Sequence, residues 1–145
     1  MMEDSDDTLV INDKTMIKIP IITDDFNTDI NFAFTSEEQS VIKKLSKNNA
    51  IFIQHSSNSV RPRYLLNTPI TYIGRDVKCD IQLEDHSVSR KHVVIKCDED
   101  GQYTAEDTGS LNGIYLNNKM GNSFKLANGD LLQVGKFKLY FFQNN

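Results

Sequence analysis

Three short polar strings interrupt the apolar runs of this chain, and their side chains suit an anionic ligand. The strings are Gly74-Arg75, Ser89-Arg90-Lys91-His92 and Ser110-Leu111-Asn112-Gly113. The guanidinium of Arg75 offers paired hydrogen bonds to a phosphate. The Ser89 hydroxyl donates a further bond, and the Asn112 amide both donates and accepts, so it suits a peptide backbone. Together the strings predict a site for a ligand that is part phosphate and part extended peptide.

Short β-prone runs surround these strings from residue 50 to the C-terminus. All seven glycines lie between Gly74 and Gly135, so turn chemistry is confined to this part of the chain. Many short strands separated by turn residues predict an all-β sandwich. The expected strands are 50–54, 63–66, 70–73, 80–83, 92–97, 103–107, 114–116, 131–134 and 138–142.

The first 49 residues have a different composition. They hold ten Asp or Glu against five Lys and no glycine, whereas residues 50–145 hold eleven basic and ten acidic residues. We expect residues 1 to about 35 to be largely disordered. Ser36 followed by Gln39 fits a capping box, which predicts a short helix within 37–47. The expected organisation is an acidic regulatory tail at 1–49 and one domain at 50–145.

Composition argues against several classes of function. The nearly neutral domain lacks the basic excess of a nucleic-acid binder. No apolar run approaches the ~20 residues of a membrane-spanning helix, and the acidic N-terminus does not fit a secretory signal. We therefore expect a cytoplasmic protein. A zinc site would have to combine Cys79, Cys97, His86 and His92, and their spacing fits no common zinc pattern, so no metal or other cofactor is expected.

The three strings and their order resemble the forkhead-associated (FHA) family. Its members are β-sandwiches of two antiparallel sheets that bind phosphothreonine peptides, and the resemblance runs from about residue 50 to the C-terminus. It implies that Arg75 and Ser89 contact the phosphate and that Asn112 holds the peptide. Arg90 follows the serine, where a second guanidinium should strengthen charge-assisted binding.

Other residues of the strings support the site by the same resemblance. His92 is the family histidine that braces the binding loop without touching the ligand, and Gly74 and Gly113 permit the flanking turns. Two positions depart from the commonest pattern. Leu111 stands where many members carry Thr or Ser, which leaves its backbone amide as a candidate phosphate donor, and Ile114 stands where Thr is frequent.

Two other interpretations compete with peptide binding. Ser89, His92 and Asp107 could be drawn as a hydrolase triad, but the sequence has no nucleophile elbow, and a serine three residues before its base does not favour that pair. We therefore expect no enzymatic activity. A domain that has lost binding is also disfavoured, because Arg75, Ser89 and Asn112 are all retained.

Residues 87–142 resemble a particular group, the small stand-alone FHA proteins of actinobacteria that inhibit 2-oxoglutarate dehydrogenase under control of serine/threonine kinases. In that group the unphosphorylated domain binds metabolic enzymes, and a phosphorylated tail threonine occupies its own domain and releases the enzyme. The tail motif of the group is absent here. Thr8, which follows two aspartates, and Thr35 are the candidate phosphorylation sites.

The resemblance therefore implies a monomeric bacterial regulator. Its partners would be phosphothreonine peptides, including its own tail, a serine/threonine kinase, and a metabolic enzyme such as 2-oxoglutarate dehydrogenase. The alternative is an FHA adaptor that recruits a phosphorylated partner in signalling, secretion or transcription, with the tail acting only as a linker.

Overall fold

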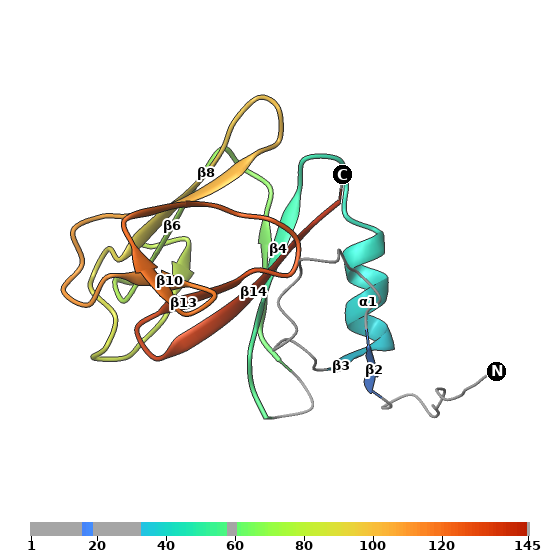
Figure 1. Ribbon diagram of the computed structural model, residues 1–145, viewed down its shortest axis with the longest axis horizontal. Helices are drawn as coiled ribbons and strands as arrows, with labels where there is room; N and C mark the ends of the chain where they lie inside the picture. The colour runs from blue at the N-terminus through green and yellow to red at the C-terminus, as the bar shows by residue number, and fades with distance from the viewer. Residues whose placement is uncertain (1–15, 19–32, 58–60, 145) are drawn as a thin grey trace.

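The computed structural model describes residues 16–18, 33–57 and 61–144, most of which form two facing β-sheets (Figure 1). The first sheet contains, in pairing order, β11 (Lys119–Gly121), β10 (Ile114–Leu116), β13 (Leu131–Val134), β14 (Phe137–Gln143), β4 (Ala50–Gln54) and β5 (Arg63–Leu66). The second contains β12 (Ser123–Lys125), β9 (Tyr103–Asp107), β8 (Val93–Cys97), β6 (Ile70–Gly74) and β7 (Ile81–Gln82). Neighbours pair antiparallel, apart from β6 and β7, which are parallel. The expected all-β sandwich is confirmed.

The main core lies between the two sheets. The Tyr103 ring from β9 packs on Phe141 of β14 with ring centroids 5.4 Å apart, and Phe52 of β4 packs on the same ring at 5.7 Å. The Tyr103 hydroxyl lies 2.6 Å from the Asn48 carbonyl oxygen and 3.1 Å from the Leu66 carbonyl oxygen, and burial raises its pKa. Alternate residues of each strand thus fill one apolar layer, as the strand patterns predict.

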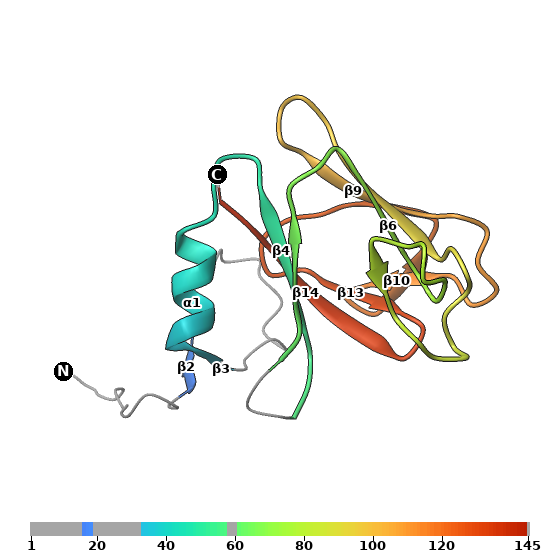
Figure 2. The ribbon, with the colours of Figure 1, turned by 180° about the vertical axis from the view of Figure 1, so that it is seen from behind.

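A second apolar cluster covers the outer face of the first sheet. It is formed by β3 (Ala33–Thr35), which pairs with β2 (Met16–Lys18), and by α1 (Ser36–Lys43), which both views place beside β4 and β14 (Figures 1 and 2). The Phe34 ring meets Tyr140 and Phe142 edge-on, with centroids 5.9 and 5.2 Å away. The buried members are Phe34, Leu45, Ile51, Ile53, Tyr140 and Phe142. Burial on both faces explains why β4 is almost entirely apolar.

The helix begins one residue earlier than its sequence pattern predicts. Thr35, not Ser36, is the N-cap: its Oγ1 accepts from the Glu38 N–H at 3.1 Å, and its own N–H donates to the Glu38 carboxylate at 3.0 Å. The same carboxylate forms a buried ion pair with Arg61, whose Nε donates to it at 3.0 Å. Thr35 and Glu38 have the capping-box spacing, so the sequence also carries the correct cap, and the ion pair with Arg61 holds the Glu38 carboxylate in place.

Most expected elements are present, and the differences concern short strands. The structure contains each of the nine predicted strands and a helix within the predicted region, although the helix ends at Lys43. Sequence patterns missed β2, β3, β11 and β12, which have three residues each and little alternation. Within the tail that is expected to be largely disordered, residues 16–18 and 33–35 pair as short strands, and the remainder of 1–35 lies outside the described residues. The described helix, α1, is too short and polar to span a membrane.

A domain boundary at residue 49/50 therefore remains a prediction, and the second cluster argues for an earlier one. Removal of residues 1–49 should expose the outward face of β4 and β14 and lower the free energy of unfolding by on the order of 5 kcal/mol. Removal of residues 1–32 retains Phe34 and α1, so it should lower the free energy of unfolding much less. Urea unfolding of the two truncated chains checks this, and equal midpoints would contradict it.

Candidate functional site

The three polar strings lie in loops at one end of the sandwich and meet at Ser89. Arg75 follows β6, Ser89 precedes β8, and Leu111 lies between β9 and β10. The Arg75 N–H donates to the Ser89 carbonyl at 3.0 Å, and the Leu111 N–H donates to Ser89 Oγ at 3.1 Å. Residues separated by up to 36 positions in the chain are thus joined through one serine.

His92 holds these loops together from inside the fold. Its side chain is fully buried, its Nδ1 accepts from the Ser89 N–H at 3.0 Å, and its Nε2 lies 2.7 Å from the Gly113 carbonyl. Because Nδ1 accepts, Nε2 must carry the proton that binds Gly113. Both ring nitrogens are therefore engaged within the protein, and the imidazole links the Ser89 loop to the Gly113 loop.

Two glycines permit the close approach of these loops. A Cβ on Gly74 would lie 2.1 Å from the carbonyl oxygen of Arg90, so any side chain there would displace the Ser89 loop. Gly113 has a φ of +72°, and a Cβ there would also lie 2.6 Å from Met120 Cε. Only glycine fits both positions without strain.

The cationic side chains of the site face solvent. The Arg75 Nε–H donates to the Val88 carbonyl at 2.9 Å, which fixes the guanidinium while leaving its terminal nitrogens for a ligand. Neither Arg75 nor Arg90 forms an ion pair with any described acidic side chain. Lys91 instead lies over the Tyr72 ring, with Nζ 5.4 Å from the centroid. The Arg75 guanidinium, fixed at the Ser89 loop, and the exposed Arg90 give this end of the sandwich the positive charge that suits a strong anion.

The hydrogen bonds also determine what Ser89 and Asn112 can offer. Ser89 Oγ accepts from Leu111, so its hydroxyl proton is directed to another acceptor. Asn112 Nδ2 donates to the Ser87 carbonyl at 3.0 Å, which leaves its amide oxygen and one N–H for a peptide backbone. The Leu111 amide, expected as a direct phosphate donor, is already bonded to Ser89, and the Leu111 side chain is 91% exposed.

Sequence reasoning missed the residues that shape the Asn112 loop. The Ser110 hydroxyl donates to the Asp107 carboxylate and accepts from the Gly113 N–H at 2.9 Å. Thr108 Oγ1 donates to the Lys91 carbonyl at 2.6 Å and so ties this loop to the Ser89 loop. A short polar residue two or three positions after an aspartate is a common loop-forming signal and could have indicated this arrangement.

The same geometry disagrees with a hydrolase triad and gives no support to a zinc site. His92 directs its nitrogens to Ser89 N–H and Gly113, so neither meets the Ser89 hydroxyl or Asp107. Cys79 Sγ donates to the Arg90 carbonyl, and burial together with the nearby Asp76 raises the pKa of its thiol. Within the ranges that the structure describes, no group of three or more potential ligands could hold a metal ion.

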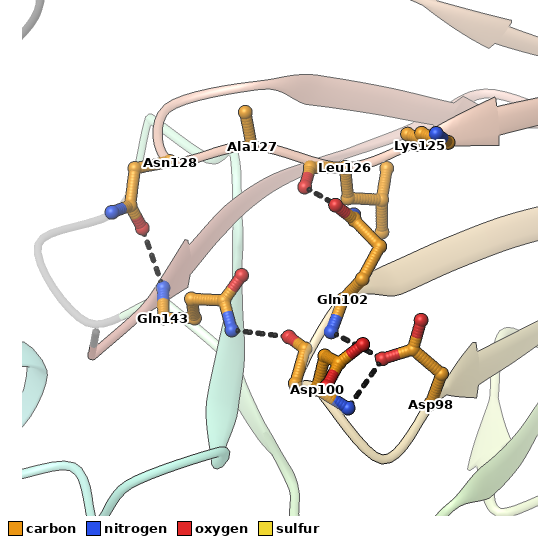
Figure 3. A pocket seen from close by; sticks show the side chains of 9 residues that line it. Asp98, Asp100, Gln102, Lys125, Leu126, Ala127, Asn128 and Gln143 are labelled. Atoms are coloured by element: carbon orange, nitrogen blue, oxygen red, sulfur yellow. Dashed lines mark hydrogen bonds between the residues drawn. The ribbon is translucent and has the colours of Figure 1, made fainter.

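A polar pocket of about 530 Å³ lies at the other end of β8 and β9 (Figure 3). Its polar side chains bind backbone groups of the residues that line it. Asp98 Oδ1 accepts from the Gln102 N–H at 2.9 Å, Gln102 Nε2 donates to the Leu126 carbonyl at 3.2 Å, and Asn128 Oδ1 accepts from the Gln143 N–H at 2.6 Å. These bonds connect three segments of the chain, so the polar residues of the pocket have a structural role.

Comparison with known proteins agrees with this arrangement. A sequence model of the FHA domain matches residues 71–135. The glycogen accumulation regulator GarA of Mycolicibacterium smegmatis is 38% identical over 109 residues, which cover 75% of this chain and 68% of the relative. This chain belongs to the FHA family. The oxoglutarate dehydrogenase inhibitor of Corynebacterium glutamicum is 35% identical over 107 residues, covering 74% of each chain.

Solved FHA structures share the sandwich. A structure from a study of phosphothreonine-dependent FHA domain interactions matches with a TM-score of 0.61 and 25% identity, over 67% of this chain and 98% of that chain. The FhaA FHA domain, solved with the intracellular domain of another protein, matches with a TM-score of 0.57 and 26% identity. The match covers 64% of this chain and 98% of that chain. Almost the whole of each solved chain thus has a counterpart in part of this one.

Substitution His92→Ala should disrupt the loop end of the domain. It leaves the Ser89 N–H and the Gly113 carbonyl without their buried partner, and we expect the free energy of unfolding to fall by about 2–4 kcal/mol. Urea unfolding measures the change, with exposed His86→Ala as the matched control. Equal stability of the two variants would show that the imidazole bridge contributes little.

Proposed function

We propose that this protein is a non-catalytic regulator that binds phosphothreonine peptides through Arg75, Ser89, Arg90 and Asn112. The observation that carries the proposal is the Arg75 guanidinium, which the Val88 carbonyl orients and which pairs with no acidic side chain among the described residues, together with the Ser89 hydroxyl, whose oxygen accepts from Leu111. A phosphothreonine carries about −1.5 to −2 charges and three acceptor oxygens, which these donors match. The Asn112 amide, oriented by the Ser87 carbonyl, binds the peptide backbone beside the phosphate.

Substitution Arg75→Ala tests the phosphate contact. Loss of a bidentate charge-assisted contact costs about 1.5–3 kcal/mol, or roughly tenfold and more in affinity. Calorimetry with a phosphothreonine peptide should show this loss, whereas Lys125→Ala at the other end of the sandwich should bind like the wild type. Unchanged affinity of Arg75→Ala would remove this residue from the site.

The client of the regulator is, on this proposal, a metabolic enzyme of the 2-oxoglutarate dehydrogenase type in the bacterial cytoplasm. Support comes from the relatives named as oxoglutarate dehydrogenase inhibitors and as a glycogen accumulation regulator. The monomeric, unphosphorylated protein binds the enzyme through the same loop end, and a serine/threonine kinase switches the interaction off. Ser89→Ala and Asn112→Ala should then weaken inhibition in a steady-state assay of the dehydrogenase.

The switch operates through the tail, with phosphorylated Thr8 docking on its own domain. The way the N-terminal segment packs favours Thr8 over Thr35 as the threonine that docks. Thr35 caps α1 next to Glu38, which fixes it on the outer face of the first sheet. Thr8 lies outside the described residues, eight positions before Met16, which pairs with Thr35.

Chain length is compatible with docking of Thr8 in the same molecule. Phe34 packs on Tyr140, whereas β14 begins beside the site, where the Lys136 N–H donates to Ser87. The distance to be covered runs from the β2–β3 pair at Tyr140 to the site at Ser87. Four strand residues span about 13 Å and the sandwich is about 10 Å thick, so this distance is roughly 20 Å. Eight fully extended residues cover about 27 Å. The r.m.s. span of a flexible eight-residue linker is roughly 16 Å, close to the distance to be covered, which corresponds to a local concentration of about millimolar.

Phosphorylation at Thr8 should therefore block the site. Kinase-treated protein should show shifted amide NMR signals at Ser89 and Asn112 and reduced binding of added phosphothreonine peptide, whereas treated Thr8→Ala should behave like the unmodified chain. Size-exclusion chromatography with light scattering should report a monomer in both cases. Modification confined to Thr35, or unmoved site signals, would contradict the switch.

The adaptor function remains the second candidate, because FhaA, which is 26% identical, was solved with the intracellular domain of another protein. An adaptor would bind a phosphorylated partner and leave the dehydrogenase rate unchanged at saturating concentration. The inhibition assay therefore separates the two functions.

A further inference from the structure

The turn formed by residues 85–89 directs two ligand-facing side chains through consecutive carbonyl groups. The Ser87 carbonyl accepts from Asn112 Nδ2 at 3.0 Å, and the Val88 carbonyl accepts from Arg75 Nε at 2.9 Å. Val88 itself is 1% exposed, which anchors the turn in the main core. The orientation of both side chains therefore depends on the backbone position of only two residues.

A network around the Ser87 hydroxyl holds this backbone in place. Asp85 Oδ2 accepts from the Ser87 N–H at 2.9 Å and from the Ser87 hydroxyl at 2.6 Å. Ser87 Oγ in turn accepts from the Lys136 N–H at 2.9 Å, and Lys136 Nζ lies 3.2 Å from Asp85 Oδ1. The hydroxyl thus links the site loop of the second sheet to the β13–β14 turn of the first.

Gly135 sets the distance between that turn and the loop. Its φ is +60°, and a Cβ there would lie 2.7 Å from the Ser87 carbonyl oxygen, 2.6 Å from Ser87 Oγ and 2.8 Å from Val88 Cγ2. Any side chain at this position would push on the two residues whose carbonyls orient Arg75 and Asn112. Glycine is therefore required here for the geometry of the site as well as for the turn.

We propose that Asp85, Ser87 and Gly135 are positioning residues for peptide binding, which act by preorganising Arg75 and Asn112. The proposal rests on the proposed function, because it assigns a role in binding at that site. None of the three residues needs to touch the ligand. Preorganisation improves affinity by reducing the ordering that binding would otherwise require.

The charge state of Asp85 suits this role. Hydrogen bonds from the Ser87 hydroxyl and backbone, followed by Lys136, lower the pKa of its carboxyl to about 2. Because this pKa lies below the unfolded value of about 3.9, the ionised carboxylate stabilises the fold at any pH above about 3.9. This stabilisation is lost as the pH falls to about 2. The acceptor that holds Ser87 therefore stays ionised throughout the neutral range.

The test compares full-length variants with a synthetic peptide that covers residues 2–14 and carries phosphothreonine at position 8. Ser87→Ala and Gly135→Ala should each bind this peptide about tenfold more weakly than the wild type in calorimetry. Ser87→Thr, which restores the hydroxyl, should recover most of the affinity. Asp85→Asn keeps a side-chain acceptor for Ser87 but removes the charge. It should weaken peptide binding less than Ser87→Ala, and it replaces Gly135→Ala if that variant does not fold.

Gly101→Ala is the matched control. Gly101 also has a positive φ, +85°, and a Cβ there would lie 2.5 Å from Asn48 Oδ1, but it belongs to the opposite end of the sandwich. Its substitution should lower the melting temperature without changing peptide affinity. In the ligand-free protein, the NMR signals of the Arg75 Nε–H and the Asn112 side-chain amide should move in Ser87→Ala and Gly135→Ala and stay in place in Gly101→Ala.

Each outcome decides a separate question. If the wild type does not bind the peptide, the proposed docking of Thr8 fails, and the side-chain signals of the free protein still test the positioning. Wild-type affinity in both Ser87→Ala and Gly135→Ala, or unmoved Arg75 and Asn112 signals, overturns the proposal. Equal loss of affinity in Gly101→Ala also overturns it, because the effect would then follow from general destabilisation.

Discussion

A buried imidazole determines how the loop end of this domain is built. His92 accepts a hydrogen bond from the Ser89 N–H and donates one to the Gly113 carbonyl, so it joins two loops that approach from different strands. Because the imidazole is fully buried, loss of either bond would leave one of its nitrogens without a partner at substantial cost. The Ser89 hydroxyl and the Asn112 side chain, one residue from Gly113, are consequently held ready for a ligand before it arrives.

The sequence contains most of what is needed to predict the sandwich and the site, because turn residues and strand patterns are local signals. Gly74 ends β6, Ser89 and Asn112 stand in loops between strongly β-prone runs, and the structure brings these segments together. The Ser87 contact to the β13–β14 turn links residues 49 positions apart, and no local pattern encodes it. The sequence likewise offers the Leu111 amide as a candidate phosphate donor but does not reveal that this amide donates to Ser89 Oγ on another loop.

The N-terminal segment shows the same limit of local patterns. The composition predicts that residues 1 to about 35 are largely disordered, yet the Phe34 ring packs on Tyr140 and Phe142 of the first sheet. The capping box uses Thr35 and Glu38, which have the same spacing as Ser36 and Gln39, and Arg61 holds the Glu38 carboxylate in place. The segment therefore acts as an anchor for the tail, and its position limits the length of chain that is available to bring a tail threonine to the site.

NMR titration of the full-length, ¹⁵N-labelled protein tests the central claim most directly, which is that the Arg75, Ser89 and Asn112 loops form one preorganised phosphothreonine site. A phosphothreonine peptide should shift the backbone signals of Arg75, Ser89, Leu111 and Asn112 to saturation, while Gly101 and Asn128 at the other end stay in place. The unphosphorylated peptide should leave all of them unmoved. Shifts centred on the opposite end, or equal shifts with the unphosphorylated peptide, would contradict the account.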